Sequence, residues 1–252
     1  MDDIHIALAA EKIGSLWGIP ITNTLIMSWV ISAVLILIAI VIGKNLKLVP
    51  GRLQLVAETV VGEGQAYVDQ SLEDKQAGVK FFPLIATLFL FILFANWSEF
   101  IPGVGSIGHF ISDGEHTEFV PMFRSIHTDL NMTLALTIIA FLVIEISGVT
   151  RLGFLKYASK FVNFKGGIVG FLVGIVELIG NLARLISLSF RLFGNILAGE
   201  VLLVVIGAFA PYIIPVPFIG FELFIGFLQA AIFALLTLAF IRIAIEEPHA
   251  AH

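Results

Sequence analysis

Five polar residues recur at helical spacing within one very apolar stretch of this chain: Glu177, Asn181, Arg184, Arg191 and Asn195. Their separations of 4, 3, 7 and 4 residues place all five on one face of an α-helix. A charged side chain that faces lipid is costly, so we expect this face to meet water or another protein. The alternative is that the arginines pair with glutamates of the same chain and hold the helices together.

Other acids flank the position of Arg191. Glu200 follows it by nine residues, which places the two side chains about opposite each other and ~13 Å apart along one helix. Glu222 and Gln229 share a face of the next apolar run, where Glu222 is the expected neighbour of Glu200. Glu145 lies on an earlier run. Acids on both sides of a fixed positive charge are what two offset proton pathways with a barrier between them require.

The composition favours a membrane environment for these residues. The chain has 252 residues, of which 58% are hydrophobic and 13% are charged, whereas soluble domains carry about 25% charged residues. Such a chain cannot cover its surface with polar groups, so lipid is the expected solvent. The N-terminal segment is acidic, unlike a signal peptide, so we expect the first span to be retained.

The apolar runs predict an all-α multi-pass membrane protein with five spanning helices. Three runs have the length of one crossing, which needs ~20 residues. A fourth tract contains APYIIPVP at 210–217, and its prolines divide it into two helices. The expected helices cover residues 21–43, 81–98, 129–150, 167–208 and 217–245.

Two further features complete the expected single membrane domain, 1–252. A helix over 167–208 would be ~60 Å long, about twice the hydrocarbon thickness, so the last two helices should form a long, strongly tilted hairpin. Residues 50–72 have an amphipathic pattern that predicts a surface helix; the alternative is a soluble loop with some helix. The remaining segments are an outer N-terminal segment, 1–20, an outer loop, 99–128, and an inner loop, 151–166.

Basic residues predict the orientation in the membrane. Five lysines and arginines lie in segment 44–80 and four in the inner loop, whereas the opposite segments contain only Lys12 and Arg124. Because cytoplasmic loops are enriched in lysine and arginine, the N-terminus is expected outside and the C-terminus in the cytoplasm.

Motifs of soluble enzymes are missing from the sequence. It has no phosphate-binding glycine loop, no HExxH, no nucleophile elbow and no basic–aromatic cluster, so we expect no cofactor and no nucleic acid. It has no cysteine for thiolate chemistry. Three histidines, His109, His116 and His127, fall in or beside the outer loop. We expect them to be solvated; proton entry and metal binding are the alternatives.

The stretch SFRLFGNILAGE, residues 189–200, resembles the signature of subunit a of ATP synthase, the ATPase A chain family. FELFIGFLQAAIFALLT at 221–237 is similar to the last span of that family. The resemblance extends from about residue 20 to the end and is strongest across 170–245. It implies the stationary membrane subunit of the Fo sector, without nucleotide chemistry of its own.

The resemblance also implies roles for individual residues. Arg191 would face the rotating c-subunit ring, favour the ionised form of each passing carboxylate and block a direct proton leak. Asn195 and Gln229 match polar positions near the arginine. Glu200 and Glu222 match the outer half-channel, although some members carry histidine at the second position. Glu145 is expected in the inner half-channel mainly because it lies close to the inner loop, and the spacing adds Glu177, Asn181 and Arg184 to the polar face.

In such a subunit, protons would load and unload on the ring and drive rotation and ATP synthesis. The implied partners are the c ring, b subunits of the peripheral stalk, other ATP synthase subunits and membrane lipid. The expected location is the bacterial inner membrane, with the mitochondrial inner membrane as the alternative. Proton and sodium coupling both remain open. Two other hypotheses are a secondary transporter, disfavoured because no inverted repeat is visible, and a passive scaffold.

Overall fold

The computed structural model describes residues 10–16, 18–44, 46–101, 103–104, 106–113, 116–161, 167–209 and 213–246. Five of its helices are long and apolar enough to cross a membrane. They are α1 (Asn23–Lys44), α3 (Lys75–Trp97), α4 (Leu130–Leu152), α6 (Gly167–Phe209) and α7 (Pro215–Ile245). This arrangement confirms the prediction of an all-α multi-pass membrane protein.

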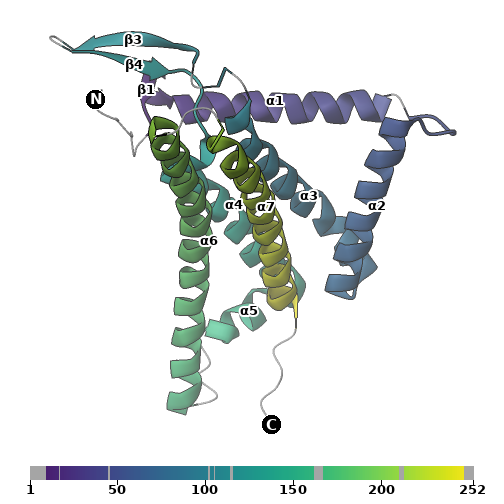
Figure 1. Ribbon diagram of the computed structural model, residues 1–252. Helices are drawn as coiled ribbons and strands as arrows, with labels where there is room; N and C mark the ends of the chain where they lie inside the picture. Colours follow the sequence, from purple (N-terminus) through teal and green to yellow (C-terminus); the bar gives the residue numbers. More distant parts are fainter. Residues whose placement is uncertain are drawn as a thin grey trace.

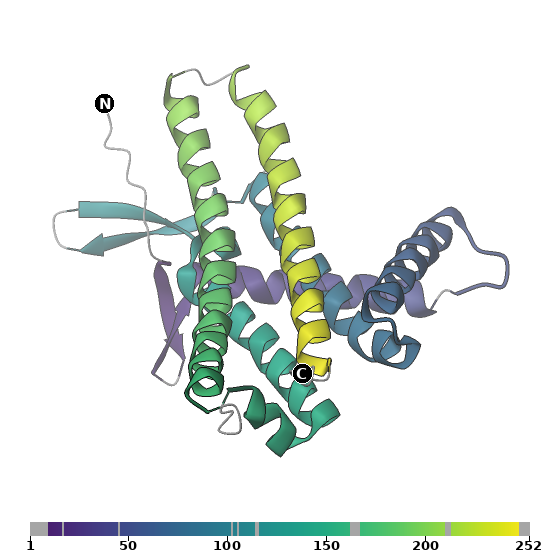
Figure 2. The ribbon, with the colours of Figure 1, turned by 90° about the horizontal axis from the view of Figure 1, so that it is seen from below.

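The last two helices are long and lie side by side, as the sequence predicts. α6 runs through 43 residues without interruption, and α7 packs beside it. Both helices lie crosswise to α1 (Figures 1 and 2). α7 begins at Pro215, where the fixed φ of proline suits the first helical turn and its missing N–H costs no hydrogen bond.

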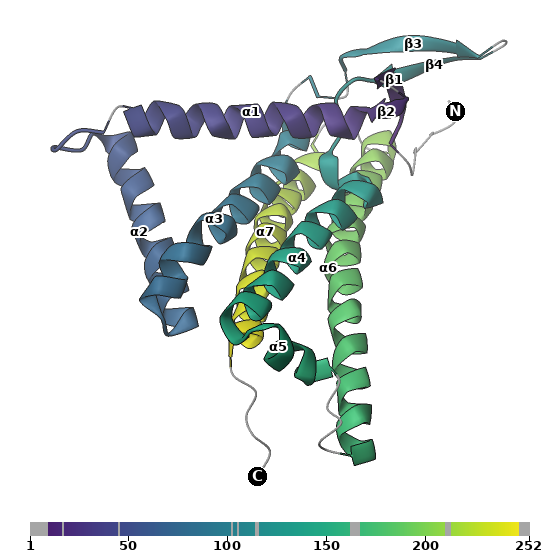
Figure 3. The ribbon, with the colours of Figure 1, turned by 180° about the vertical axis from the view of Figure 1, so that it is seen from behind.

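Two helices are too polar or too short to be spans. α2 (Arg52–Leu72) follows α1 and turns crosswise to it (Figure 3). It buries Val68 and Leu72 in a cluster shared with α3 and α7, while Leu55 and Val56 stay exposed. α5 (Phe154–Phe161) is a short amphipathic helix between α4 and α6. Each of these helices therefore buries only part of its surface in the bundle.

Two small β-hairpins, which the sequence analysis did not predict, lie at one end of the bundle. β1 (Lys12–Leu16) pairs antiparallel with β2 (Ile19–Thr22). β3 (Gly108–Asp113) pairs antiparallel with β4 (His116–Pro121), and this hairpin projects away from the helices (Figure 1). We call this end, with the short helices η1 (Ser98–Phe100) and η2 (Ile126–Thr128), the strand end. The opposite end is the α5 end.

The middle of the bundle is packed by apolar side chains from four helices. Leu88 of α3, Ala140 of α4, Leu192 of α6 and Phe233 of α7 are all buried in one cluster. Because Leu192 points into this cluster, with 1% of its surface exposed, the neighbouring position on α6 is turned toward the outside. The core thereby sets the direction in which Arg191 points.

Side-chain caps fix where the helices begin. Asp74 caps α3 by accepting hydrogen bonds from the backbone N–H groups of Gln76 and Ala77, at 2.9 and 3.2 Å. Asp129 caps α4 through the N–H of Asn131, at 2.9 Å, and also accepts from the hydroxyl of Thr24 at 3.1 Å. Thr24 belongs to the first turn of α1, so one aspartate holds the starts of two helices together.

Candidate functional site

Arg191 lies on the outer surface of α6, and its side chain is exposed. Within the described part of the chain it has no hydrogen bond or ion pair. Asn195, one turn further along, is also exposed. The polar face predicted from the spacing therefore points out of the bundle at this level, which leaves Arg191 available to a group from another molecule.

Gln229 occupies a different environment from Arg191. It lies on the buried face of α7 with 8% of its surface exposed. Across the described residues, no hydrogen bond joins it to Arg191 or Asn195. Gln229 and Arg191 are therefore not joined by a hydrogen bond in the described part of the chain.

A cavity of about 220 Å³ opens between α6, α7 and the end of α3 at the strand end. Its polar lining comes from Asn96, Glu99, Asn195 and Glu222. One water molecule needs only ~10–15 Å³ of such volume, so the cavity can hold several. This strand-end cavity has a mostly apolar lining with four polar side chains, has room for water and reaches Asn195.

Glu222 is packed tightly against α6 at this cavity. Its side chain is 9% exposed, and its Oε1 atom is buried without a hydrogen-bond partner. The carboxylate occupies the space where a Cβ at position 199 would be, so only glycine fits there with this carboxylate in place. Gly199 thus lets α7 bring a carboxylate directly onto the surface of α6.

Glu200 points to a neighbour that the sequence analysis did not identify. Its Oε2 lies 3.4 Å from Nη2 of Arg124, and only 8% of the arginine side chain is exposed. Glu99 and Glu222 both interact electrostatically with Glu200. Glu99 directly follows the predicted span 81–98, and an acid at the end of a span is a sequence signal for a polar site there. Arg124 has no such signal, because arginines are common in loops.

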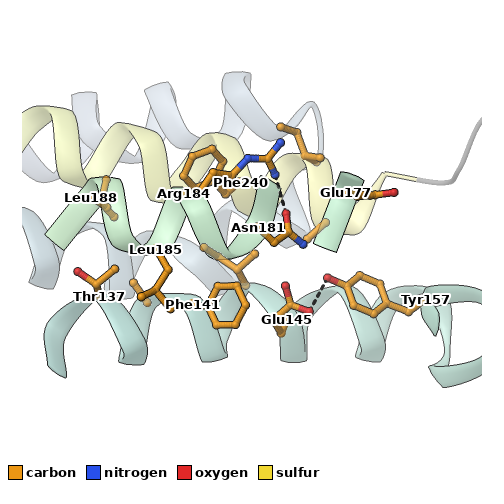
Figure 4. A pocket seen from close by; sticks show the side chains of 14 residues that line it. Thr137, Phe141, Glu145, Tyr157, Glu177, Asn181, Arg184, Leu185, Leu188 and Phe240 are labelled. Carbon is orange, nitrogen blue, oxygen red and sulfur yellow. Dashed lines mark hydrogen bonds between the residues drawn. The ribbon is translucent and has the colours of Figure 1, made fainter. Parts of the chain in front are cut away.

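A second cavity, of about 40 Å³, lies at the α5 end (Figure 4). Glu145, Tyr157, Glu177, Asn181 and Arg184 line it. The structure thus brings together four residues that the sequence analysis had selected from two separate runs. The volume is sufficient for a water molecule.

Arg184 is held at this α5-end cavity without a carboxylate. Its Nη1 donates to Oδ1 of Asn181 at 2.8 Å, and its guanidinium lies 5.1 Å from the ring centre of Phe240 (Figure 4). No ion pair between Arg184 and a glutamate occurs among the described residues. In the described part of the chain, Arg184 therefore contacts an amide and an aromatic ring instead of a glutamate.

Tyr157 of α5 positions Glu145 at the same cavity. Its hydroxyl donates to Oε2 of Glu145 at 2.9 Å (Figure 4). The ring fills the notch left by Gly148, where a Cβ would overlap it. Burial, then the hydrogen bond to Glu145 and its charge, raise the pKa of Tyr157 above its ordinary value. The phenol therefore stays protonated and continues to donate to Glu145.

His127 corrects the expectation that the histidines of the outer loop are solvated. It is 1% exposed in η2, and its Nδ1 lies 2.7 Å from Oδ1 of Asn96. The amide nitrogen of Asn96 donates to the carbonyl of Gly226, so Oδ1 is the acceptor and His127 Nδ1 carries the hydrogen. The histidine connects η2 through α3 to α7. His109 is partly buried, and the side chain of His116 lies outside the described residues.

This burial predicts a loss of stability in acid. Desolvation lowers the pKa of His127 to about 3, whereas an unfolded histidine titrates near 6.5. Between these two pKa values the unfolded chain binds a proton at His127 and the folded protein does not. The free energy of unfolding is therefore highest above pH ~6.5 and falls as the pH drops toward 3, by at most about 1.4 kcal/mol per pH unit. Thermal unfolding of the assembled complex against pH measures it. His127→Gln should flatten this part of the profile; an unchanged slope would contradict the assignment.

Along α6, the two cavities stop on either side of Arg191. The lining of the α5-end cavity reaches Leu188, and that of the strand-end cavity starts at Asn195. These residues are separated by ~10 Å of helix, and Arg191 belongs to neither lining. A fixed positive charge therefore lies between two separate cavities, each of which contains polar side chains.

Comparison with known proteins identifies the family. The ATP synthase A chain family matches residues 25–242, which is most of the chain. The chain belongs to the ATP synthase A chain family. It is thus a multi-pass membrane subunit of an ATP synthase, which confirms the family suggested by SFRLFGNILAGE.

Curated relatives within this family come from several bacteria. The ATP synthase subunit a proteins of Geotalea daltonii and Geobacter sulfurreducens are each 34% identical over 88% of this chain and 87% of their own length. That of Campylobacter jejuni strain 81-176 is 34% identical over 87% of this chain and 89% of its own. The similarity spans nearly the whole length in each case. With five apolar helices, it indicates a multi-pass inner-membrane protein.

Proposed function

We propose that this chain is the proton-conducting stator of an Fo sector, with two half-channels that load and unload protons on the carboxylates of a c ring. The observation that carries the proposal is the pair of separate cavities, each containing polar side chains, that end on either side of the exposed Arg191. A single continuous cavity would let protons cross without turning a rotor. Two offset cavities instead require a carrier that moves between them.

Arg191 is the barrier in this scheme. Its guanidinium is always charged and exposed on α6, so it can pair with one ring carboxylate at a time. Its field favours the ionised carboxylate and opposes the passage of a proton from one cavity to the other. A carboxylate that has taken up a proton loses its attraction to Arg191 and can enter lipid, which sets a direction for ring movement.

The surface of α6 fits contact with a large apolar partner. Many of its apolar side chains are exposed, among them Val173, Val176, Phe190 and Leu202. The crosswise placement of α6 and α7 relative to α1 (Figure 1) would let both helices follow the curved wall of a ring. The peripheral-stalk b subunits are proposed partners on the basis of family membership alone.

Basic residues support an inner location for the α5 end. Arg151 and Arg242 lie there, joined by ion pairs to Asp74 and Glu73 at 3.3 and 2.6 Å. Lysine and arginine concentrate on the cytoplasmic side of membrane proteins. The strand-end cavity would then load protons from outside, and the α5-end cavity would release them inside.

Cysteine accessibility tests this function, because the chain contains no native cysteine. Ala198→Cys lines the strand-end cavity and Leu185→Cys lines the α5-end cavity. A membrane-impermeant thiosulfonate reacts only with hydrated thiols, so Ala198→Cys should be modified from the outside only and Leu185→Cys from the inside only. Each modification should lower proton flux.

Ile186→Cys is the matched control, because this exposed residue lines neither cavity. It should resist the reagent from both sides. Modification of Ala198→Cys and Leu185→Cys from the same side would contradict the two-channel arrangement.

A further inference from the structure

A third cavity lies at the α5 end, where α3 begins and where α4 and α7 end (Figure 3). Its volume is about 260 Å³, and it shares no lining residue with either cavity beside Arg191. The first turns of α3, the last turns of α4 and Ile245 of α7 line it. Because spanning helices begin and end near the surface of a bilayer, this α3–α4 pocket lies at about the depth of the lipid headgroups.

The polar lining of the α3–α4 pocket is suited to an anion. It contains the ammonium of Lys80, the guanidinium of Arg151 and the amide of Gln76, and all three side chains are exposed. These groups donate hydrogen bonds, and two of them carry a positive charge. None of the described residues in the lining is acidic. The pocket therefore offers donors and positive charge without a carboxylate of its own.

The acids close to the pocket leave these cations available. Asp74 accepts from the first turn of α3 and lies 3.3 Å from one nitrogen of Arg151. A guanidinium has five N–H donors, so Arg151 can bind a second anion beside Asp74. Glu246 follows Ile245 but does not line the pocket. Lys80 has no ion pair among the described residues, so its charge is uncompensated.

An exposed apolar stripe on α4 leads to the pocket. Ile139, Leu142 and Ile146 are each at least 50% exposed. Thr150 of the pocket lining follows them at helical spacing, so the four residues share one face of α4. From 139 to 150 the stripe is ~16 Å long, about half of the ~30 Å hydrocarbon core. An apolar path of about one leaflet therefore ends at a cationic pocket.

We propose that the α3–α4 pocket binds the phosphate of an anionic membrane phospholipid, whose acyl chain lies along the apolar stripe of α4. Lys80 and Arg151 bind the phosphate oxygens, and Gln76 donates a further hydrogen bond. Basic pockets between spanning helices on the cytoplasmic side suit acidic headgroups, and the orientation proposed above places the pocket on that side. A free phosphate could bind the same donors but would make no use of the stripe. This site is separate from the path of protons.

Photolabelling of the complete ATP synthase in phosphatidylcholine vesicles tests the site. The probe is phosphatidylglycerol with a diazirine in its acyl chain, and mass spectrometry locates the label, normalised to the amount of assembled complex. The label should appear on residues 139–150. Lys80→Gln and Arg151→Gln should each lower this labelling about fivefold, and together about 25-fold, the effect of one and of two basic residues near an anionic membrane surface.

Lys75→Gln is the matched control, because this exposed lysine lies at the same end of α3 but outside the pocket lining. It should label like the unchanged protein, and a loss as large as that of Lys80→Gln would overturn the proposal. Full labelling of the double variant would overturn it too. Lys80→Arg keeps the charge and covers the case in which the glutamine variants fail to assemble; it should keep most of the label, and a fivefold loss contradicts the assignment.

Competition with the unchanged protein distinguishes a lipid from free phosphate. Unlabelled phosphatidylglycerol should displace the probe, whereas phosphatidylcholine and millimolar inorganic phosphate, at an ionic strength matched with chloride, should not. Displacement by inorganic phosphate would assign the pocket to free phosphate and overturn the lipid assignment. Equal labelling by a diazirine phosphatidylcholine would exclude recognition of the anionic headgroup. Absence of label from residues 139–150 would mean that another subunit covers the stripe, which also overturns the proposal.

Discussion

Replacement of Arg191 by alanine is expected to lower coupled proton transport strongly while leaving the subunit assembled. The side chain is exposed and, among the described residues, has no partner to lose, so its removal leaves no buried group unsatisfied and should cost little stability. In the proposed function, the carboxylates of the c ring would lose their counter-charge, which shifts carboxylate pKa values by about 1–3 units, so proton-driven ATP synthesis should fall roughly 10- to 1,000-fold. ATP synthesis and ATP-driven pumping in inverted vesicles measure the loss.

The same change should raise passive proton leakage, because the barrier between the cavities is gone. Arg191→Lys keeps a positive charge and is expected to block the leak better than alanine, although a shorter ammonium cannot reproduce the planar donor set of arginine. Arg184→Ala is a useful comparison, since this second arginine of α6 bonds Asn181 at the α5 end and lies outside the barrier. Normal coupled pumping by an assembled Arg191→Ala complex would exclude the proposed function.

The architecture was predictable because its signals are local. Each candidate spanning helix is long and apolar enough to cross a bilayer. The prolines at 211, 215 and 217 predicted the break after α6, and two of them lie in the first turn of α7. The outward direction of Arg191 also follows from local spacing, since Leu188 and Leu192 on the adjoining face of α6 are buried. The amphipathic pattern likewise predicted α2 within two residues of its observed start.

The strand-end site was only half predictable, because its completion depends on contacts distant in sequence. Arg124 and Glu200 are 76 residues apart, and no periodicity relates an outer-loop arginine to a helical glutamate. His127 was misplaced for the same reason: its partner Asn96 is 31 residues away in another helix. The β3–β4 hairpin did have a local signal, because Asp113 pairs with His116 and the sequence between them is Gly-Glu; a Gly-X pair between two strands is typical of tight hairpins.

Gly199→Ala is expected to be the most informative small substitution in the chain. The added methyl group would overlap the carboxylate of Glu222, and the atoms it meets are the far end of a flexible side chain rather than backbone. The fold can therefore accept the change while the carboxylate must move. Displacement of a proton-transfer group by about 1 Å can lower rates by about 100-fold, so proton flux should fall between roughly 10- and 100-fold with little change in thermal stability.

Gly207→Ala provides the matched control, because this glycine lies on the same helix and an added Cβ there meets nothing within 4 Å. Both changes should favour the helix slightly, by up to about 1 kcal/mol each, so any difference between them reports on Glu222. Glu222→Asp withdraws the carboxylate by one methylene and should restore part of the flux when combined with Gly199→Ala. Full flux in Gly199→Ala would mean that the position of the Glu222 carboxylate does not limit proton entry.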